Sequence, residues 1–147
     1  MYQDYKDVAE FRMIYIKEAH AADGRRPVGY AKELGITEHD NYKERCTTAE
    51  MLFKNKELTI PCLVDSMDDK TNKDYSAYPD RIFLVRKDGK LAVAAARGPW
   101  GFSPALKETQ AWLAEFKESG KEPELKDSKD DSSSKSNDSK ATKRRKK

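Results

Sequence analysis

The chain has 147 residues, of which 37% are charged and 37% are apolar, and its net charge is +3. This length fits one domain with a modest core, and no run approaches the ~18 apolar residues that a membrane-spanning helix needs. From residue 120 onward there are ten Lys and Arg against six Asp and Glu, which gives this segment a net charge of +4. Because the whole chain carries +3, the residues before 120 have a net charge of −1. A nearly neutral body argues against nucleic-acid binding by the folded part.

Residues 119–147 are predicted to form a disordered, charged tail. From residue 120 onward this segment has no aromatic residue and one leucine, Leu125, which is too little apolar surface to offset the cost of ordering the chain. The basic run at 143–147 could contact phosphates or serve as a nuclear import signal, whereas the simpler interpretation is a solubilising end. Because the first residues lack the basic-then-apolar layout of a secretory signal, we expect a cytoplasmic, soluble protein.

The first half of the chain predicts two strands separated by a long excursion and a helix. Residues 2–10 are typical of the end of a helix, and the apolar, β-forming run 11–16 predicts a buried strand. Residues 24–40 hold Pro27 and three glycines among charges, which favours a long loop that covers a neighbouring surface. Residues 41–54 have apolar side chains at helical spacing and predict a helix, and 59–65 predict a second buried strand.

The second half predicts a hairpin followed by a helix. Residues 68–77 are polar and turn-like, and 81–85 and 91–95 form two β runs around Asp88-Gly89, a dipeptide that favours tight antiparallel turns. Residues 103–117 predict a helix that is capped by Ser103, has Pro104 at its first position and covers the sheet. The chain therefore belongs to the α/β class and closes with a β-β-α unit.

Three groups that can carry protons follow the first predicted strand, namely Glu18, His20 and Asp23. Histidine titrates near neutrality, and a glutamate can fix its tautomer or relay a proton. At positions i and i+2 just beyond a strand, Glu18 and His20 are expected to project from the same edge, where open α/β sheets place their sites. The alternative is that both are ordinary polar residues of a loop.

The two cysteines have no spacing typical of a reactive site. Cys46 and Cys62 are separated by fifteen residues, which fits neither a Cys-x-x-Cys redox pair nor a four-ligand zinc site. Cys62 lies in an apolar run and is expected in the core, while Cys46 falls within a predicted helix. We therefore predict no metal site, and neither thiol is expected to be the nucleophile of an active site.

Five sequence pieces occur together in this order: Tyr15-Ile-x-Glu-Ala-His20 with Asp23-Gly24, His39 followed by Arg45, Asp65-Ser-Met67, Tyr75-x-Ala-Tyr78-x-x-Arg81, and Arg97-Gly-Pro99-x-Gly101 with Trp112-Leu113. In their residues, order and spacing they resemble the iodothyronine deiodinase family, a branch of the thioredoxin-fold superfamily. The resemblance covers about residues 5–118. It implies a domain over residues 1–118 with a thioredoxin-like sheet and flanking helices, incomplete at its N-terminus and ending in a β-hairpin plus helix.

The resemblance also implies a chemistry. In this family a selenocysteine or cysteine nucleophile removes iodine reductively from an aromatic ring, and an external thiol regenerates the enzyme without a further cofactor. The implied substrate is a halogenated phenol such as thyroxine, with a peroxide or disulfide substrate as the related possibility.

Six positions match functional residues of the family. Those implied in proton handling are Tyr15, Glu18 and His20, and those implied in holding the substrate are His20, His39, Asp65 and Arg81. The residues themselves leave alternatives open, because His39 could be a surface residue at the start of a helix, and Arg81 could form a structural salt bridge with Asp65 or Asp80.

The chain departs from the family pattern at its start. It begins where the helix that follows the family's nucleophile is expected to end, so the strand and loop that carry the Cys or Sec are not part of this sequence. We expect the missing strand to lie between the strands at 11–16 and 81–85, so that its loss leaves backbone groups unpaired. A misassigned start codon, a short homologue whose flanking strands pair directly, or a strand received from a partner would each account for this. A second departure is Arg25-Arg26-Pro27, where the family commonly has an aromatic residue.

Two functions therefore stay open from the sequence. The first is a deiodinase-like, thiol- or selenol-dependent oxidoreductase that is inactive as this chain alone, and the second is a non-catalytic thioredoxin-fold binding module. An unpaired strand edge would also favour a homodimer.

Overall fold

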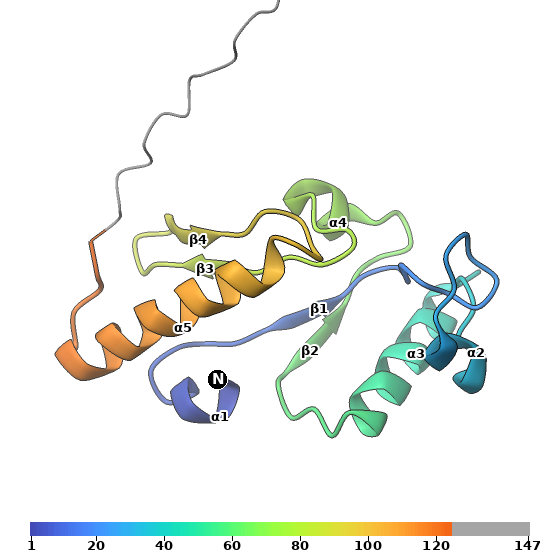
Figure 1. The fold of residues 1–147 in the computed structure, drawn as a ribbon, viewed down its shortest axis with the longest axis horizontal. Helices are drawn as coiled ribbons and strands as arrows, with labels where there is room; N and C mark the ends of the chain where they lie inside the picture. The colour runs from blue at the N-terminus through green and yellow to red at the C-terminus, as the bar shows by residue number, and fades with distance from the viewer. Residues whose placement is uncertain (125–147) are drawn as a thin grey trace, which may run out of the picture.

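The computed structural model describes residues 1–124 of the chain, as helices and short strands (Figure 1). In chain order the elements are α1 (Tyr2–Tyr5), β1 (Met13–Tyr15), α2 (Gly29–Leu34), α3 (Tyr42–Asn55), β2 (Cys62–Val64), α4 (Lys70–Tyr75), β3 (Phe83–Val85), β4 (Leu91–Ala94) and α5 (Phe102–Ser119). The predicted α/β class is thus confirmed, and every predicted strand is present in shortened form.

The strands form two separate two-stranded sheets. β1 pairs in parallel with β2, with Met13 opposite Cys62 and Tyr15 opposite Val64. β3 pairs in antiparallel fashion with β4, with Leu84 opposite Val93. Within residues 1–124 no ladder joins β1 to β3. This agrees with the prediction of a gap between the strands at 11–16 and 81–85. The alternative in which β1 and β3 close the gap by pairing directly is wrong for this structure.

The β3–β4 hairpin follows from its turn sequence, as predicted. Gly89 has a φ of +81°, a conformation that costs a glycine little and other residues more. The Asp88 carboxylate accepts a hydrogen bond from the backbone N–H of Lys90 at 3.1 Å, and Gly89 N–H donates to the carbonyl of Arg86 at 3.0 Å. The turn therefore stabilises itself locally.

The two long helices form where helical spacing predicts them, but one predicted cap is wrong. Asn41 caps α3, since its side-chain oxygen accepts from the Glu44 N–H at 3.1 Å. The predicted cap of α5, Ser103, instead lies inside the helix, which begins after Gly101 and has no side-chain cap. A Cβ at Gly101 would come within 2.1 Å of the Ala96 carbonyl oxygen, so close backbone packing fixes the start of α5.

Two segments predicted as loops contain short helices. The excursion at 24–40 holds α2, which ends at Gly35 in the left-handed conformation with a φ of +64°. This segment buries Ala31 and Ile36, 2% and 4% exposed, so it covers a surface as predicted while forming a turn of helix. The polar segment at 68–77 forms α4, whose first N–H groups bind an acidic side chain that precedes it, a contact that sequence periodicity does not reveal.

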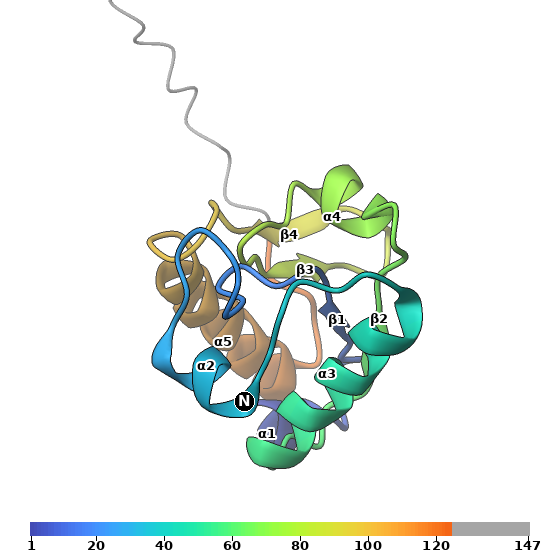
Figure 2. The same ribbon diagram turned by 90° about the vertical axis from the view of Figure 1, so that its right-hand side faces the viewer.

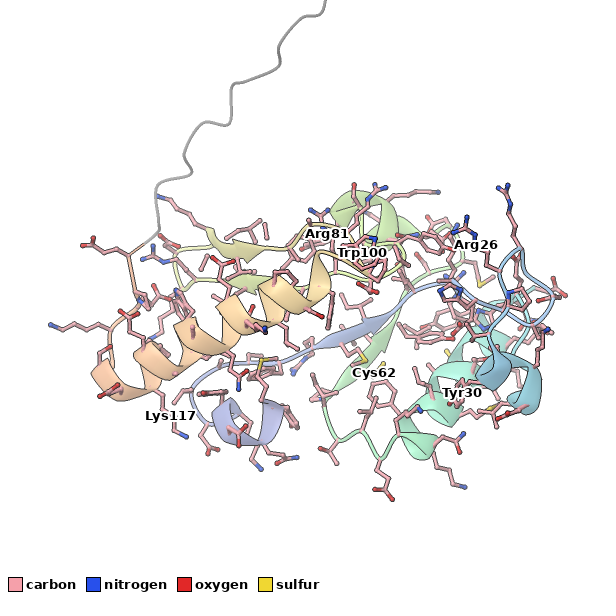
Figure 3. All side chains as sticks on the ribbon, viewed as in Figure 1. Arg26, Tyr30, Cys62, Arg81, Trp100 and Lys117 are labelled. Atoms are coloured by element: carbon pink, nitrogen blue, oxygen red, sulfur yellow. The ribbon has the colours of Figure 1, made fainter. Side chains whose placement is uncertain are left out.

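The main apolar cluster lies between α5 and the hairpin. Figures 1 and 2 place α5 along the β3–β4 sheet, with α2 and α3 together at the other end of the molecule. The buried members of the cluster are Leu84, Val93, Ala95, Ala105 and Leu113. α1 packs against the same cluster, and the Lys117 ammonium (Figure 3) donates to the Asp4 carbonyl at 2.7 Å. The closing β-β-α unit therefore carries five of the ten buried apolar residues among the described ones.

The predictions about membrane-spanning helices and about the charged tail can be compared with the structure only over residues 1–124. None of the helices within residues 1–124 is long and apolar enough to cross a membrane. Most of the predicted tail, residues 125–147, lies outside the described residues. At its described start, Glu122 accepts hydrogen bonds from Arg86 Nε at 3.3 Å and from the Lys87 N–H at 2.8 Å.

We predict that Leu113→Ala lowers the free energy of unfolding by about 2–5 kcal/mol, because it removes a fully buried side chain from the centre of this cluster. The matched control is Leu91→Ala, at a residue that is 46% exposed, for which we expect less than about 1 kcal/mol. Urea unfolding followed by circular dichroism measures both. Equal losses in the two variants would contradict this placement of the core.

Candidate functional site

The centre of the candidate site is the contact between Tyr15 and Glu18. Tyr15 is the last residue of β1 and is 8% exposed, and its hydroxyl donates a hydrogen bond to Glu18 Oε1. Burial, followed by the hydrogen bond to Glu18, raises the pKa of Tyr15 above its ordinary value of 10.0. The phenol therefore stays protonated near neutral pH and holds the Glu18 carboxylate at the end of the strand.

His20 lies apart from this pair. Its ring is exposed, and Nδ1 is 2.8 Å from the carbonyl oxygen of Arg26, a residue on the excursion at the right of Figure 3. No hydrogen bond joins His20 to Glu18 within the described part of the chain. β1 ends at Tyr15, so the strand alternation does not continue through the next residues, and the expectation that Glu18 and His20 project from one edge stays a prediction.

His39 lies beside Tyr15 instead. Their ring centroids are 6.0 Å apart, and His39 lines a pocket of about 400 Å³ between the start of α3 and the loop before it. Both ring nitrogens are buried without a hydrogen-bond partner among residues 1–124. Burial, followed by the positive charge of Arg45, lowers the pKa of His39 below its ordinary 6.5, so the ring is neutral at pH 7. The structure thus brings Tyr15, Glu18 and His39 together.

Asp65 follows β2 and binds the backbone. Its Oδ1 accepts from the N–H groups of Ser66 at 3.0 Å and Thr71 at 2.9 Å, and its Oδ2 accepts from Asn72 N–H at 2.9 Å. Burial acts to raise the pKa of Asp65, but these hydrogen bonds outweigh it, and the pKa lies below the ordinary 3.8. The carboxylate thus closes the turn between β2 and α4.

Arg45, which the sequence did not single out as a site residue, completes this turn from α3. It is 3% exposed, and its Nη1 lies 2.7 Å from the Ser66 carbonyl oxygen, 3.3 Å from the Asp65 carbonyl oxygen and 3.0 Å from Asp69 Oδ1. A buried arginine with carboxylate and carbonyl partners is held in place rather than available to a ligand. The sequence signal for it is its place after His39 in one of the five family pieces, which does not reveal the partners.

Arg81 binds backbone carbonyls of two other segments. Its Nε donates to the Ala95 carbonyl at 2.6 Å, and its Nη1 donates to Tyr75 at 2.8 Å and Ser76 at 3.3 Å. No salt bridge of Arg81 to Asp65 or Asp80 occurs in the described residues. The guanidinium therefore fixes the end of α4 against the residue that follows β4, on the hairpin side of the molecule (Figure 3). The predicted role of Arg81 in substrate binding stays a prediction.

The two thiols are free, and neither forms a hydrogen bond with the side chain of Tyr15 or Glu18. Cys62 on β2 is half-buried, and its sulfur donates to the Leu63 carbonyl at 3.3 Å. Burial raises the pKa of Cys62 above its ordinary 9.0, against a lowering contribution from the Tyr15 backbone N–H. Such a thiol is mostly protonated near neutral pH and is a weak nucleophile. No group of three metal-ligating side chains occurs within residues 1–124.

A sequence model of the iodothyronine deiodinase family matches residues 1–117. The chain belongs to this family. Among its relatives, the type II iodothyronine deiodinase of Neoceratodus forsteri is 36% identical over 114 residues, the thyroxine 5-deiodinase of Gallus gallus 31% over 114 residues, and the type II iodothyronine deiodinase of Homo sapiens 31% over 114 residues. These alignments cover 76–78% of this chain and 41–42% of each relative. The chain thus spans about two fifths of the length of the deiodinases that it matches.

We predict that Asp65→Asn lowers the free energy of unfolding by about 1–3 kcal/mol at pH 7, because an amide cannot accept all three N–H groups as a carboxylate does. The folded-state pKa of Asp65 lies below its unfolded value, so its stabilisation is present above the unfolded pKa and is lost as pH falls through the folded pKa. Wild type and variant should therefore converge in urea unfolding between about pH 5 and pH 2. Asp7→Asn, at an exposed residue, is the control, and a constant difference between wild type and Asp65→Asn at all pH values would contradict the assignment.

We predict that Cys62 in the folded protein reacts slowly with iodoacetamide at pH 7, because burial keeps the thiol protonated. The measurement uses the Cys46→Ser variant, so that Cys62 is the remaining thiol, and follows the alkylation rate against pH. The midpoint of the profile should lie higher in the folded protein than in the same variant in urea. A lower midpoint in the folded state would identify Cys62 as an activated thiol.

Proposed function

We propose that this chain forms the acid–base and substrate-binding part of a deiodinase-like, thiol- or selenol-dependent oxidoreductase that removes iodine from an iodinated phenol such as thyroxine. Residues 1–124 do not supply the nucleophile, which comes from another segment or another chain. The observation that carries this proposal is the Tyr15–Glu18 pair with His39 beside it at the end of β1, in a chain of the deiodinase family.

Three properties of this cluster support an acid–base role. The phenol of Tyr15 is held protonated, and the Glu18 carboxylate accepts a hydrogen bond from its hydroxyl. The neutral ring of His39 has two nitrogens without hydrogen-bond partners among the described residues. Together they offer a donor, an acceptor and a group that can exchange a proton with either. Neither Cys46 nor Cys62 forms a hydrogen bond with the side chains of this cluster.

The proposed reaction balances with two thiols. A thiolate or selenolate attacks the iodine atom, the carbon–iodine bond breaks, and the ring carbon takes a proton from the acid–base cluster. A second thiol then displaces iodide from the sulfur or selenium, so that two thiols become one disulfide and the aryl iodide becomes an arene. Soft, polarizable sulfur or selenium is required for the first step, whereas the oxygen and nitrogen groups of the cluster move only the proton.

We predict that the 147-residue chain alone releases no iodide from thyroxine with dithiothreitol, and that a small selenol in solution restores release above the rate of the selenol alone. We expect an increment of about tenfold, which is modest for positioned acid–base catalysis. Tyr15→Phe should abolish this increment, and Tyr42→Phe, which removes the hydroxyl of a half-exposed tyrosine on α3, should retain it. Iodide is measured in solution.

Each outcome of this assay has a distinct meaning. Turnover by the chain without added selenol, lost in Cys62→Ser, would show that the nucleophile lies within residues 1–124. Binding of thyroxine by fluorescence titration without any increment from the selenol would favour the binding module over the oxidoreductase. The absence of binding would remove the iodinated phenol as the substrate.

A further inference from the structure

The proposed reaction takes one proton from the acid–base cluster and has to return one. In the first step the cluster gives a proton to the ring carbon. In the second step the incoming thiol has to lose its proton before its sulfur attacks, because the thiolate is the nucleophile. A thiol that delivers this proton to the cluster restores the cluster for the next turnover. The place where a thiol reaches the cluster is therefore part of the site.

His39 is the member of the cluster that lines a pocket. This pocket, of about 400 Å³, lies between the start of α3 and the loop before it, at the end of the molecule where α2 and α3 lie together (Figures 1 and 2). Neither Tyr15 nor Glu18 lines it. The His39 ring does, and its centroid is 6.0 Å from that of the Tyr15 ring. One imidazole thus adjoins both the pocket and the end of β1.

The state of the His39 ring suits the transfer of a proton from a thiol. Both ring nitrogens are buried and have no hydrogen-bond partner among residues 1–124. Burial, followed by the charge of Arg45, lowers the pKa of His39, so the ring is neutral at pH 7 and one of its nitrogens is an acceptor. A neutral imidazole beside a thiol is the usual base that activates a sulfur nucleophile.

The rest of the pocket wall is mostly polar and carries both signs of charge. Lys43 forms no ion pair within the described residues. The Glu44 carboxylate is fixed at the wall, because it accepts from the Asp40 N–H at 2.9 Å and from Asn41 Nδ2 at 2.7 Å. Neighbouring charges of opposite sign complement a ligand that carries both an ammonium and a carboxylate. The volume is within the range of small-molecule sites.

We propose that this pocket binds the thiol that regenerates the enzyme, and that this thiol is a peptide-sized molecule with an ammonium and a carboxylate. The inference rests on the proposed function, since it names the reductant of the same reaction. The S–H proton passes to a ring nitrogen of His39, and the thiolate attacks the sulfur or selenium that carries iodine. A bond forms between these two atoms, and iodide leaves with the electron pair of the bond that breaks. Lys43 and Glu44 hold the charged ends of the thiol.

The test follows binding of S-methylglutathione, which keeps the charges of a peptide thiol but forms no disulfide with the chain. There are two histidines, so His20→Gln assigns the ring-proton NMR signal of each. At pH 7 and low salt the His39 signal should shift with a dissociation constant of about 1 mM, and the His20 signal should stay in place. Lys43→Gln should weaken binding about fivefold, and about 0.5 M salt should weaken it in wild type through screening.

Two controls separate this site from a general affinity for peptides. Lys54→Gln removes an exposed lysine at the other end of α3, outside the pocket, and should keep the wild-type affinity. The tripeptide with alanine in place of the modified cysteine should bind about threefold more weakly, because it has no sulfur to place beside the ring. Circular dichroism and urea midpoints establish that each variant is folded.

The failures of the two proposals are distinguishable. An unmoved His39 signal, equal binding by wild type and Lys43→Gln, or equal binding of the alanine tripeptide would overturn this inference. The proposed function would then still stand on the selenol-dependent release of iodide. If S-methylglutathione binds as expected but the selenol gives no increment, the proposed function fails and the pocket remains a binding site for a thiol peptide.

Discussion

The turn after β2 depends on a cluster of two buried side chains, Asp65 and Arg45, each of which binds the backbone of the turn. The carboxylate binds the N–H groups of Ser66, Thr71 and Asn72, and the guanidinium binds the carbonyls on the same turn. Three elements, β2, α4 and α3, are thereby joined through two side chains. Because β2 is the ladder partner of β1, the same cluster sets the position of Tyr15 at the end of β1. Removing the Asp65 carboxylate would leave three backbone N–H groups without their acceptor, and removing Arg45 would take its closest cation from Asp69.

This structural role changes what the conserved-looking family motif can do in this chain. Asp65 and Arg81 hold the backbone around α4, so they shape a pocket rather than enter it. The groups free to meet a ligand are less distinctive in sequence, as a lysine at the start of a helix commonly faces solvent. Family motifs thus identify the frame of the site, whereas the polar groups without partners identify where a ligand fits. In this chain the two ring nitrogens of His39 are such groups.

The sequence predicts local structure well where one local interaction decides it. The Asp88-Gly89 turn and the start of α3 at the Asn41 cap both depend on contacts within four residues; the predicted hairpin and the predicted helix over 41–54 are confirmed, although the cap itself was not predicted. It fails where a distant partner decides: α4 forms on the N–H groups that Asp65 binds, and Gly101 starts α5 because Ala96 leaves no room for a side chain. The family resemblance assigns proton handling to His20 and not to His39, whereas His39 is the histidine that lies beside Tyr15. Which histidine lies beside Tyr15 depends on how the excursion at 24–40 folds back.

The separation of the two sheets gives the remaining constraint. β1 and β3 each have one ladder partner among residues 1–124, so each has an edge whose N–H and C=O groups make no ladder bond. Ile14 in β1 and Val85 in β3 are 40% and 58% exposed, and two-stranded sheets gain little stability by themselves. Here helices stabilise them instead, α5 against the hairpin and α3 against β2. An edge of this kind accepts a further strand through backbone hydrogen bonds. The proposed reaction needs a nucleophile beside Tyr15 and Glu18, and Tyr15 lies at the end of β1. A strand that pairs with the free edge of β1 would lie beside Tyr15, so under the proposed reaction this edge is where the nucleophile would be supplied.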